Sequence, residues 1–465
     1  MPELPEVETV RRILEPIVVG KRIEEIKIYR EKNVITGDSS FIAPLLGKKF
    51  LSVGRVGKFL IFHLEDELAI VSHLRMEGKY FERETDVEEK HDIISFKLSS
   101  KRYLVYNDVR KFGIIGLYKE KDLLTLSPVG KVGKEPFYLS KEELFDSLKR
   151  KRKEPLKTAL LDQTMIAGLG NIYVDETLFA ASLNPLEEAS NVTLDDASRI
   201  IEESKRILQE AIDLGGSTIK SYHPKEGVNG EMQNELKVYG HKRKPCPRCG
   251  LPLRKITVGG RGTTYCPLCQ RKKGKPFVLG ITGPIHSGKS VASLFFKEKG
   301  YIYISSDDEI HNLYKDEEVL EEVKTILGPN AVKNGKIDSA FLRKALGEDE
   351  KKNESLKAYL YPKLKEAIEK KLSLLKEDDK VVLEVPLLAG SGLEDLIDYV
   401  IIIVSDVEKQ KERLLLEGRD ADALLKLNEN YPLKENEKLA SIKIINAYPE
   451  VELTSQIAKL SFLFQ

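Results

Sequence analysis

The stretch LLDQTMIAGLGNIYVDETLF, residues 160 to 179, contains the end of one helical pattern and the start of another. The glycines of AGLG separate the two patterns, and glycine permits the tight turns that such a junction needs. Backbone amides at the start of the second helix, together with Asn171, can bind a phosphate group, because free N–H groups and the helix dipole favour an anion there. The stretch therefore predicts a junction of two helices that grips phosphate.

Regular patterns on either side of this junction predict the rest of the first half. SKEELFDSLKR, KTALLDQ and TLDDASRIIEESKRILQEAIDLGG, between residues 141 and 214, have helical spacing and helix ends. LPEVETVRRILEPI begins with Pro5 in a first turn and carries one apolar stripe, formed by Val7, Val10, Leu14 and Ile17. Short β-rich runs such as KFLIFHL and KRYLVYND fill residues 22 to 118. We expect an N-terminal helix, an antiparallel sandwich or barrel, and then a helical domain.

All four cysteines of the chain occur as two C-x2-C pairs, CPRC and CPLC, which sixteen residues separate. Each pair can supply two thiolates from one turn, so the spacing predicts a zinc ribbon rather than four unrelated thiols. Four thiolates leave the metal no open position, and we therefore expect a structural Zn²⁺. The predicted ligands are Cys246, Cys249, Cys266 and Cys269.

Residues 283 to 290 read GPIHSGKS, a complete G-x4-G-K-S motif between the strand-like FVLGIT and the helix-like VASLFFKEKG. In this context backbone amides cradle phosphates, Lys289 reaches the terminal phosphates and Ser290 ligates Mg²⁺. The pattern predicts a parallel α/β domain that binds ATP or GTP. The predicted nucleotide-binding residues of the loop are Gly283, His286, Ser287, Gly288, Lys289 and Ser290.

The near-neutral charge of the chain, 75 Lys and Arg against 74 Asp and Glu, conceals two unlike halves. Residues 1 to 276 contain 48 basic and 40 acidic residues, a balance of +8, whereas residues 277 to 465 contain 27 and 34, a balance of −7. A basic module is a candidate for a polyanionic partner, although a basic face can also be merely solvated.

Composition and the N-terminal sequence exclude several other classes. No apolar run approaches the roughly 18 residues of a membrane helix, and MPELPEVETVRR has acidic residues where a secretory signal needs basic ones. With 41% hydrophobic residues and 32 glycines, the chain is neither collagenous nor broadly disordered. We expect a cytoplasmic protein, and a monomer.

Residues 1 to about 271 resemble formamidopyrimidine-DNA glycosylase, a bifunctional enzyme that excises oxidised purines. The resemblance rests, in order, on MPELPEVETVRR, VGKFL, HLRMEGKY, YNDVRKFG, LLDQTMIAGLGNIYVDETLF and the ribbon with GGRGTTYC. It implies double-stranded DNA with oxidised bases or abasic sites as the partner. It also implies catalytic roles for Pro2 as the nucleophile, Glu3 as the general acid, Glu6 as a supporting carboxylate, and Lys58 and Arg261 in strand elimination.

The residue types suit this chemistry. After removal of Met1, Pro2 would present a secondary amine, and an α-amino group has a reference pKa of about 7.7 to 8, well below that of lysine. A neutral amine can attack the anomeric carbon and form a Schiff base. Without the resemblance, however, acidic residues such as Glu3 and Glu6 are simply favourable at a helix start, and Lys58 in a hairpin turn could be merely solvated.

The same resemblance implies a set of DNA contacts. Met76, Arg110 and Phe112 would fill the gap that a flipped nucleotide leaves, although Phe112 could equally be a core residue. Glu77 would contact the flipped base, and His91, Arg152 and Asn171 would contact phosphates. The glycine-bearing loop after Gly216 corresponds to a segment that closes over the lesion.

Residues 277 to about 450 resemble dephospho-coenzyme A kinase in the GITGPIHSGKS loop, ISSDDEIHNLY, VVLEVPLL and IIIVSDVEKQKERLLLEGRD. The resemblance implies ATP, Mg²⁺ and dephospho-coenzyme A, with Asp307 activating the acceptor hydroxyl and Arg413 and Arg419 in a lid. The chain departs from the family pattern at Ser305 and Ser306, at Tyr361 where histidine is usual, at Ala389 where phenylalanine is usual, and at Asn428. These departures leave open a degenerate nucleotide-binding module.

Together these patterns predict a multidomain chain, α+β and then α/β. The expected domains are a catalytic β-sandwich at 1–132, a helix–two-turn–helix DNA-binding domain at 133–236, a zinc-ribbon finger at 237–271, a linker at 272–276 and a P-loop kinase-like domain at 277–465. Two alternatives remain: a damage-binding protein without catalysis, and a glycosylase for oxidised pyrimidines.

Overall fold

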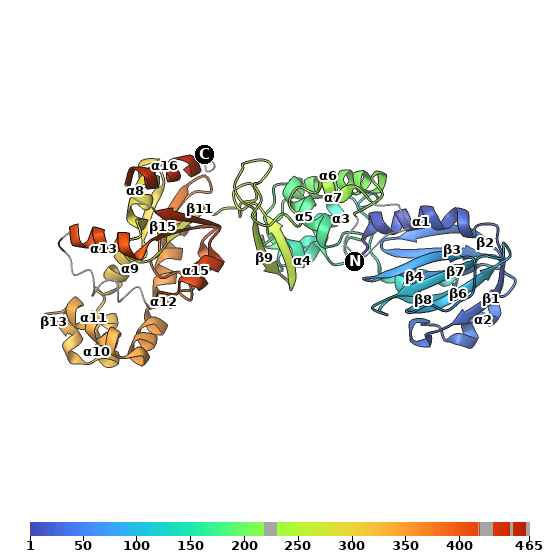
Figure 1. The fold of residues 1–465 in the computed structure, drawn as a ribbon, viewed down its shortest axis with the longest axis horizontal. Helices are drawn as coiled ribbons and strands as arrows, with labels where there is room; N and C mark the ends of the chain where they lie inside the picture. The colour runs from blue at the N-terminus through green and yellow to red at the C-terminus, as the bar shows by residue number, and fades with distance from the viewer. Residues whose placement is uncertain (218–229, 417, 419–430, 447–449, 462–465) are drawn as a thin grey trace. The chain divides into compact units, whose positions relative to one another are not determined.

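A computed structural model describes the chain except residues 218–229, 417, 419–430, 447–449 and 462–465 (Figure 1). The chain forms two compact units. The first unit comprises Met1–His241 and Lys255–Tyr265, and the second comprises Lys242–Arg254 and Cys266–Gln465. The four cysteines thus belong to the second unit, while most of the hairpin between the two cysteine pairs belongs to the first.

The first unit opens with helix α1 (Leu4–Val18), as the sequence predicts. Pro5 lies in its first turn, and the Glu3 and Glu6 side chains form a capping box. Val7, Val10 and Leu14 are buried, so the predicted apolar stripe faces the core, with Ile17 partly buried beside it.

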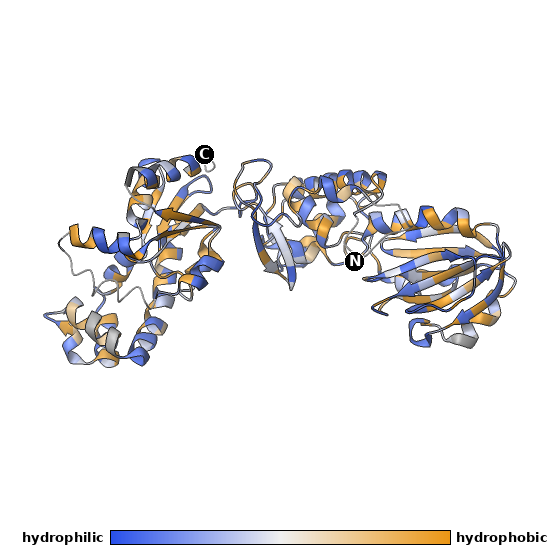
Figure 2. Ribbon diagram, viewed as in Figure 1, coloured by the Kyte–Doolittle hydropathy of each residue, from blue (hydrophilic) through white to orange (hydrophobic). Residues whose placement is uncertain are grey.

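Two four-stranded antiparallel sheets follow, in the orders β1-β6-β7-β5 and β2-β3-β4-β8. Apolar residues of both sheets, among them Phe96 and Phe62, enter one core, and Figure 2 shows apolar and polar residues alternating along the strands. The predicted antiparallel sandwich is therefore confirmed. The elements are β1 (Ile23–Ile28), α2 (Asp38–Leu45), β2 (Phe50–Val56), β3 (Phe59–Leu64), β4 (Leu68–His73), β5 (Gly78–Arg83), β6 (Asp92–Leu98), β7 (Tyr103–Asp108) and β8 (Ile114–Lys119).

The helical part of the first unit has its own apolar core, which also receives Leu4 from α1. Capping boxes at Ser140 and Thr193 begin its two amphipathic helices, α3 (Lys141–Arg150) and α6 (Leu194–Asp213). The glycine-bearing junction AGLG lies between α4 (Leu156–Leu160) and α5 (Asn171–Ala180), as predicted. The short helix α7 (Met232–Glu235) and the hairpin of β9 (Arg254–Val258) and β10 (Arg261–Tyr265) come later in the chain.

A five-stranded parallel sheet, in the order β12-β15-β11-β16-β17, forms the centre of the second unit. Successive residues of a strand face opposite sides, so Leu279 packs with α8 and α16 while Val278 packs with α12. The P-loop follows the carboxyl end of the central strand β11, as the sequence predicts. The strands are β11 (Phe277–Thr282), β12 (Ile302–Ser305), β15 (Lys380–Glu384), β16 (Tyr399–Ser405) and β17 (Ile442–Asn446).

Helices surround this sheet, and a small cluster on α10, α11 and α12 forms a separate core. The helices are α8 (Lys289–Glu298), α9 (Ser306–Leu313), α10 (Glu317–Leu327), α11 (Ser339–Glu348), α12 (Glu350–Ser373), α13 (Val407–Leu416), α15 (Leu433–Leu439) and α16 (Glu450–Ser461), with a small hairpin of β13 (Val332–Lys333) and β14 (Lys336–Ile337). Among the described residues, no helix combines the length and apolarity that crossing a membrane requires.

Candidate active sites

Pro2 and Glu3, which follow the exposed Met1, are buried at the junction between α4 and α5. The Glu3 carboxylate accepts hydrogen bonds from the backbone N–H groups of Gly170, Ile172 and Tyr173 at 2.7, 2.9 and 3.3 Å. These amides lie at the start of α5, where the sequence predicts a bound phosphate. The junction therefore holds a carboxylate of the protein itself, beside the buried Pro2.

Glu6 occupies the other side of the N-terminal segment. Its carboxylate accepts hydrogen bonds from the Glu3 backbone N–H at 2.9 Å, the Tyr173 hydroxyl at 2.6 Å and the Ser217 backbone N–H at 2.8 Å. These contacts fix the direction in which the first residues leave α1. Glu6 is thus a positioning carboxylate in this structure.

Lys58 lies in the turn between β2 and β3 and is only 5% exposed. Its Nζ donates to the Leu169 carbonyl at 2.7 Å, so the hairpin brings this amine to the same junction as Glu3. Burial excludes the alternative that Lys58 is a solvated turn residue. Arg55 supports the turn, since its guanidinium binds Glu8 on α1 and Glu135, and Glu135 also accepts the Gly57 N–H at 2.7 Å.

Burial shifts the pKa of both groups toward their neutral forms. Desolvation raises the pKa of Glu3 to about 7, with Lys58 opposing the shift and Glu6 adding to it. Desolvation likewise lowers the pKa of Lys58, while Glu3 and Glu6 oppose this and Arg261 reinforces it. A carboxyl that is half protonated near pH 7 can donate a proton, which a solvated glutamate cannot do.

The β9–β10 hairpin is attached to α5 through a fully buried ion pair that sequence reasoning missed. Lys157 Nζ donates to Asp175 Oδ1 at 2.7 Å and to the Gly262 carbonyl at 3.0 Å, and Asp175 Oδ2 accepts the Thr264 N–H at 2.9 Å. Asn171 Nδ2 also donates to the Gly262 carbonyl, at 3.1 Å. These contacts fix the strand that begins at Arg261, whose own side chain is exposed. Lys157 and Asp175 lay in recognised helical patterns, which carry no signal of pairing.

The remaining predicted DNA residues lie in turns and are accessible to different degrees. Phe112 is 56% exposed with the Arg110 guanidinium 5.0 Å from its ring centre, so the core alternative is wrong. Met76 and Glu77 are half-buried in the turn between β4 and β5. His91 and Arg152 have positive φ angles of 78° and 49°. Buried atoms of two predicted phosphate contacts, His91 Nδ1 and Asn171 Oδ1, have no hydrogen-bond partner among the described residues.

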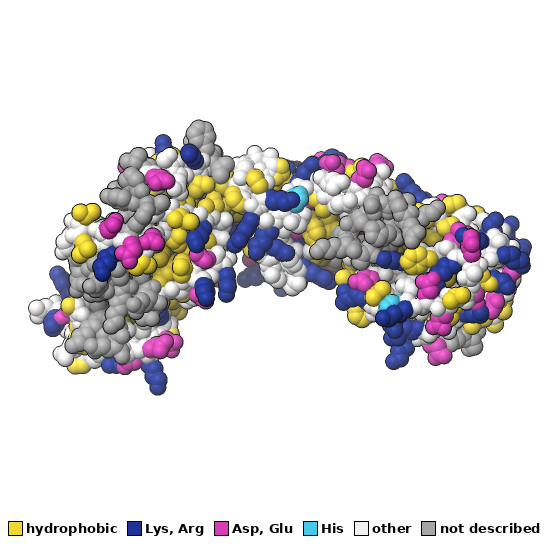
Figure 3. Space-filling view, in the orientation of Figure 1, with side chains coloured by type: hydrophobic (Ala, Val, Ile, Leu, Met, Phe, Trp, Pro, Cys, Tyr) yellow, Lys and Arg dark blue, Asp and Glu magenta, His cyan; other side chains and the backbone are white. Residues whose placement is uncertain are grey.

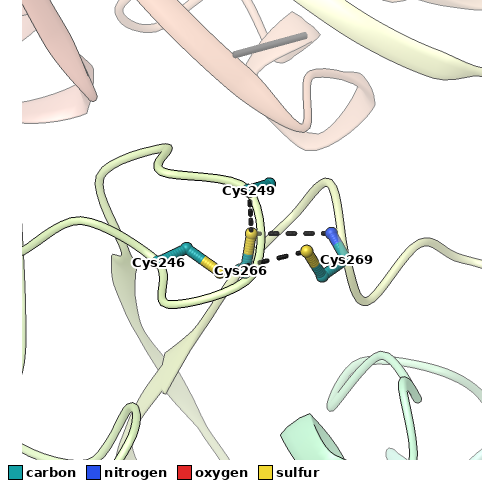
Figure 4. A group of neighbouring side chains, drawn as sticks. All are labelled: Cys246, Cys249, Cys266 and Cys269. Atoms are coloured by element: carbon teal, nitrogen blue, oxygen red, sulfur yellow. Dashed lines mark hydrogen bonds between the residues drawn. The ribbon is translucent and has the colours of Figure 1, made fainter. Parts of the chain in front are cut away.

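The four cysteine side chains point toward one another from two loops (Figure 4). Their sulfur atoms all lie within 4.8 Å of one another, with Cys246 and Cys269 3.9 Å apart and Cys249 and Cys266 3.5 Å apart. Thiolates around a tetrahedral zinc with bonds of about 2.3 Å lie about 3.8 Å apart, so the cluster fits Zn²⁺. Lys242, Arg243 and Lys244 precede the cluster and are exposed, and Figure 3 shows basic side chains gathered around β9.

In the second unit the P-loop has the backbone shape that phosphate binding requires. Gly283, with φ 152°, could carry no side chain, since a Cβ would lie 2.1 Å from the Ile403 carbonyl oxygen. His286 and Gly288 also have positive φ angles, and Ser287 is buried. Lys289 is 8% exposed, and its Nζ donates to the Pro284 carbonyl of its own loop at 2.7 Å. Burial lowers the pKa of Lys289, and the nearby Glu384 and Asp307 oppose that shift.

Glu384 is a second residue that sequence reasoning missed. It ends the apolar strand β15 and accepts hydrogen bonds from the Ser290 and Tyr303 hydroxyls at 2.8 and 3.0 Å. An acidic residue at the end of an apolar strand beside a P-loop is a typical metal-holding carboxylate, so the pattern VVLE was the available signal. Asp307 lies on α9, close enough to Lys289 and Glu384 to interact with both charges. Desolvation raises the pKa of Asp307, Glu384 adds to this shift and Lys289 opposes it.

The departures from the kinase pattern have different surroundings. Burial raises the pKa of Tyr361, and the nearby Asp307 carboxylate raises it further. Tyr361 also lines an open cavity of about 460 Å³ with Gly390 and Gly392. The Ala389 N–H donates to Asn436 Oδ1 at 2.9 Å. Arg413, an expected lid residue, lies on α13, but its side chain is not among those described. Arg419 and Asn428 lie outside the described residues. In the first unit, most of the glycine-bearing loop after Gly216 also lies outside them.

Four family models match the chain. They are described as the formamidopyrimidine-DNA glycosylase N-terminal domain (residues 1–115), the formamidopyrimidine-DNA glycosylase H2TH domain (132–223), a zinc finger found in FPG and IleRS (243–271) and dephospho-CoA kinase (277–449). The three glycosylase-related models match most of the first unit and the cysteine knuckles.

Similar proteins agree with these matches. Formamidopyrimidine-DNA glycosylase of Exiguobacterium sibiricum is 47% identical over 275 residues, 58% of this chain and 99% of the relative. That of Streptococcus mutans is 47% identical over 274 residues and is covered completely. A mutant of Lactococcus lactis FPG, solved with DNA containing Fapy-dG, is 43% identical with a TM-score of 0.55, and the match covers 58% of this chain and all of that one.

The fold and these matches define residues 1 to about 271 as a helix–two-turn–helix protein with a zinc ribbon. This part of the chain matches glycosylase relatives over 99 to 100% of their length, at 44 to 47% identity. The chain therefore belongs to the formamidopyrimidine-DNA glycosylase family.

Proposed function

We propose that the first half of the chain is a bifunctional DNA glycosylase and abasic-site lyase for oxidised purines such as 8-oxoguanine and formamidopyrimidines. The observation that carries this proposal is the Glu3 carboxyl, which three backbone N–H groups hold beside Pro2 and whose pKa burial raises to about 7. A proton donor thus adjoins the residue that becomes the N-terminal amine when Met1 is removed. Similarity to FPG structures solved with Fapy-dG and abasic-site DNA supports the substrate class.

In the proposed reaction the neutral Pro2 amine forms a bond to the anomeric carbon of the damaged nucleotide. The glycosidic bond breaks, and the base leaves with its electron pair and takes up a proton. The sugar ring then opens as its oxygen accepts a proton from Glu3, leaving a Schiff base between Pro2 and the deoxyribose. Glu6 orients the backbone beside the reacting amine.

Strand cleavage follows by two eliminations. The Schiff base acidifies the neighbouring carbon, so a proton leaves it and the 3′-phosphate departs, and a second elimination releases the 5′-phosphate. Lys58 is held at the same junction, and burial lowers its pKa, which favours the neutral amine that would remove a proton. Arg261, which the anchored hairpin presents, would balance the charge of a departing phosphate.

DNA must supply the nucleotide in a flipped conformation. The exposed Phe112 with Arg110, and the half-buried Met76, are suited to occupy the gap in the base stack. His91, Arg152 and Asn171 are the proposed phosphate contacts, and Glu77 the proposed contact to the base. Oxidised pyrimidines are the competing substrate, and matched duplexes with an oxidised purine or an oxidised pyrimidine distinguish the two by rate.

We also propose that the second unit is an ATP-dependent kinase acting on the 3′-hydroxyl of dephospho-coenzyme A. Lys289 on the P-loop, the Ser290–Glu384 pair and Asp307 support it. Asp307 would accept the hydroxyl proton as the acceptor oxygen bonds to the γ-phosphorus and ADP leaves. The hydroxyl and carboxylate oxygens of Ser290 and Glu384 suit Mg²⁺, which would neutralise phosphate charge.

Two variants of the full chain test both proposals together. Pro2→Gly should abolish strand cleavage at 8-oxoguanine and leave coenzyme A formation intact, whereas Lys289→Ala should do the reverse. If Pro2→Gly and wild type bind damaged DNA equally and neither cuts it, the chain is a damage-binding protein. If ATP binds but no coenzyme A forms, the second unit is a degenerate nucleotide-binding module.

A further inference from the structure

The cysteine knuckles share a hydrophobic core with the P-loop sheet. Leu251, in the turn after the first cysteine pair, is fully buried in a cluster that contains Phe277, Leu279 and Tyr399 of the sheet. Leu268, between the second pair, packs against the same cluster, as does Cys249 itself. Both knuckles thus contribute apolar side chains to the second unit's core.

Polar contacts join the same two parts. The Arg254 guanidinium, five residues after Cys249, donates to the backbone carbonyls of Ile397 and Asp398 at 3.1 and 2.8 Å. The Asp398 carboxylate in turn accepts the Val278 N–H of β11 at 2.9 Å. Arg271, just after the second knuckle, lies with its guanidinium 5.7 Å from the centre of the Phe277 ring. A guanidinium that donates to two carbonyls fixes the position of its own segment relative to those carbonyls, so these contacts hold the knuckle against the sheet in one defined arrangement.

The contacts lie at one end of the sheet. Phe277 and Tyr399 are the first residues of β11 and β16, and Tyr301 immediately precedes β12. The strands are parallel, so these residues mark the amino ends of the sheet, whereas the P-loop follows the carboxyl end of β11. The knuckles therefore cover the end of the sheet opposite the nucleotide loop, and they do not line the candidate kinase site.

From this shared core we infer that the zinc knuckles are a structural part of the P-loop domain, so that metal binding at the four cysteines stabilises the parallel sheet as well as the finger. Without metal, four converging thiols have nothing to hold them together, and the two turns lose their fixed shape. Leu251 and Leu268 would then leave the core, exposing the amino ends of β11 and β16. The inference depends on neither catalytic proposal.

Hydrogen exchange of the full chain, with the metal bound and after its removal by a chelator, tests the inference directly. Removal should raise the exchange rates of amides in β11, β15 and β16 at least about tenfold, equivalent to about 1.4 kcal/mol. The antiparallel strands β2 to β4 of the first unit serve as the internal reference and should not change. Faster exchange confined to residues 242–271, with an unchanged parallel sheet, would overturn the inference.

Two variants of the metal-bound protein separate the shared core from metal chemistry. Arg254→Ala removes both carbonyl contacts and leaves the cysteines intact, so exchange in β11 and β16 should rise although zinc content stays at one per chain. Lys255→Ala, its exposed neighbour on β9, is the matched control and should leave exchange unchanged. Equal exchange in both variants and wild type would contradict a supporting role for the knuckle.

Discussion

The Glu3 carboxylate lies 2.7 Å from the backbone N–H of Gly170, a residue 167 positions later in the chain, and fits there only because Gly170 has no side chain. A Cβ at Gly170 would lie 2.3 Å from the Glu3 carboxyl carbon. Gly170→Ala should therefore displace the proposed general acid and reduce 8-oxoguanine excision at least about a hundredfold, the scale of general acid catalysis. Single-turnover cleavage measures this effect.

The control for this prediction is Gly20→Ala, where a Cβ meets open space and only the positive φ of 82°, which the extended Gly170 does not share, is strained. This variant should be somewhat less stable to unfolding, but its rate of 8-oxoguanine excision should change little. If Gly170→Ala excises as fast as Gly20→Ala, the position of Glu3 does not limit the reaction.

The raised Glu3 pKa predicts an unusual pH profile. Excision needs protonated Glu3, with a pKa of about 7, and so slows as pH rises through that value. It also needs the neutral Pro2 amine, whose reference pKa is about 7.7 to 8, and so quickens with pH up to that range. The single-turnover rate should thus peak near about pH 7.5, with only a minority of molecules in the active protonation state. A rate that keeps rising to pH 9 would remove Glu3 from the role of acid.

The same shift affects stability. Between pH 4.5 and about 7 the unfolded chain loses the Glu3 proton while the folded chain keeps it, so this group makes the first unit less stable as pH rises. Glu3→Gln should flatten that part of the pH dependence, as urea unfolding at several pH values would measure. An unchanged slope would mean that Glu3 titrates normally in the folded chain.

The buried Lys157–Asp175 pair predicts a stability defect with a specific rescue. Lys157→Met leaves the Asp175 carboxyl unpaired and should cost about 3 kcal/mol, the low end for a broken buried pair, because the carboxyl can take up a proton. The pKa of Asp175 is already raised by burial to about 6. Asp175→Asn should restore much of this loss in the double variant, since its amide can accept from Thr264 and donate to a carbonyl.

Hydrogen exchange in α5 and β10 measures this defect, and Lys153→Met, an exposed neighbour, serves as the control. Excision should stay low in the rescued double variant, because Arg261 depends on the hairpin that Lys157 anchors. A double variant no more stable than Lys157→Met alone would show that the pair is not the source of the loss.

Glu384→Gln should abolish phosphoryl transfer by the second unit while sparing DNA cleavage. The amide keeps one acceptor oxygen for Ser290 but lacks the negative charge that Mg²⁺ requires. Glu366→Gln, an exposed position on α12, is the matched control. Coenzyme A formation measures the effect, and full activity of Glu384→Gln would exclude this carboxylate from metal binding.

Local patterns predicted the elements well, because helix caps, strand alternation and the P-loop motif are short-range signals. The cysteine pairs were predictable for the same reason, and the structure brings them within bonding range of one metal. The burial of Glu3 and Lys58, by contrast, arises where α1, the β2–β3 turn and the start of α5 meet, and no single stretch contains that information. Lys157 and Asp175 were missed because an ion pair between two helices produces no periodic pattern in the sequence.

The association of the knuckles with the parallel sheet could not be predicted either. From sequence, residues 237–271 formed a separate finger followed by a linker, since cysteine spacing reports only the metal. Whether Leu251 faces solvent or a core depends on what folds against it, and in this chain the P-loop sheet does so.

The most direct test of the proposed chemistry is to trap the covalent intermediate. The full chain, with Met1 removed, is mixed with duplex DNA containing 8-oxoguanine and sodium borohydride, and the adduct is digested and located by mass spectrometry. The deoxyribose should be found on the Pro2 nitrogen, and the adduct should disappear in Pro2→Gly but persist in Lys289→Ala. No adduct, or an adduct on Lys58, would contradict Pro2 as the nucleophile.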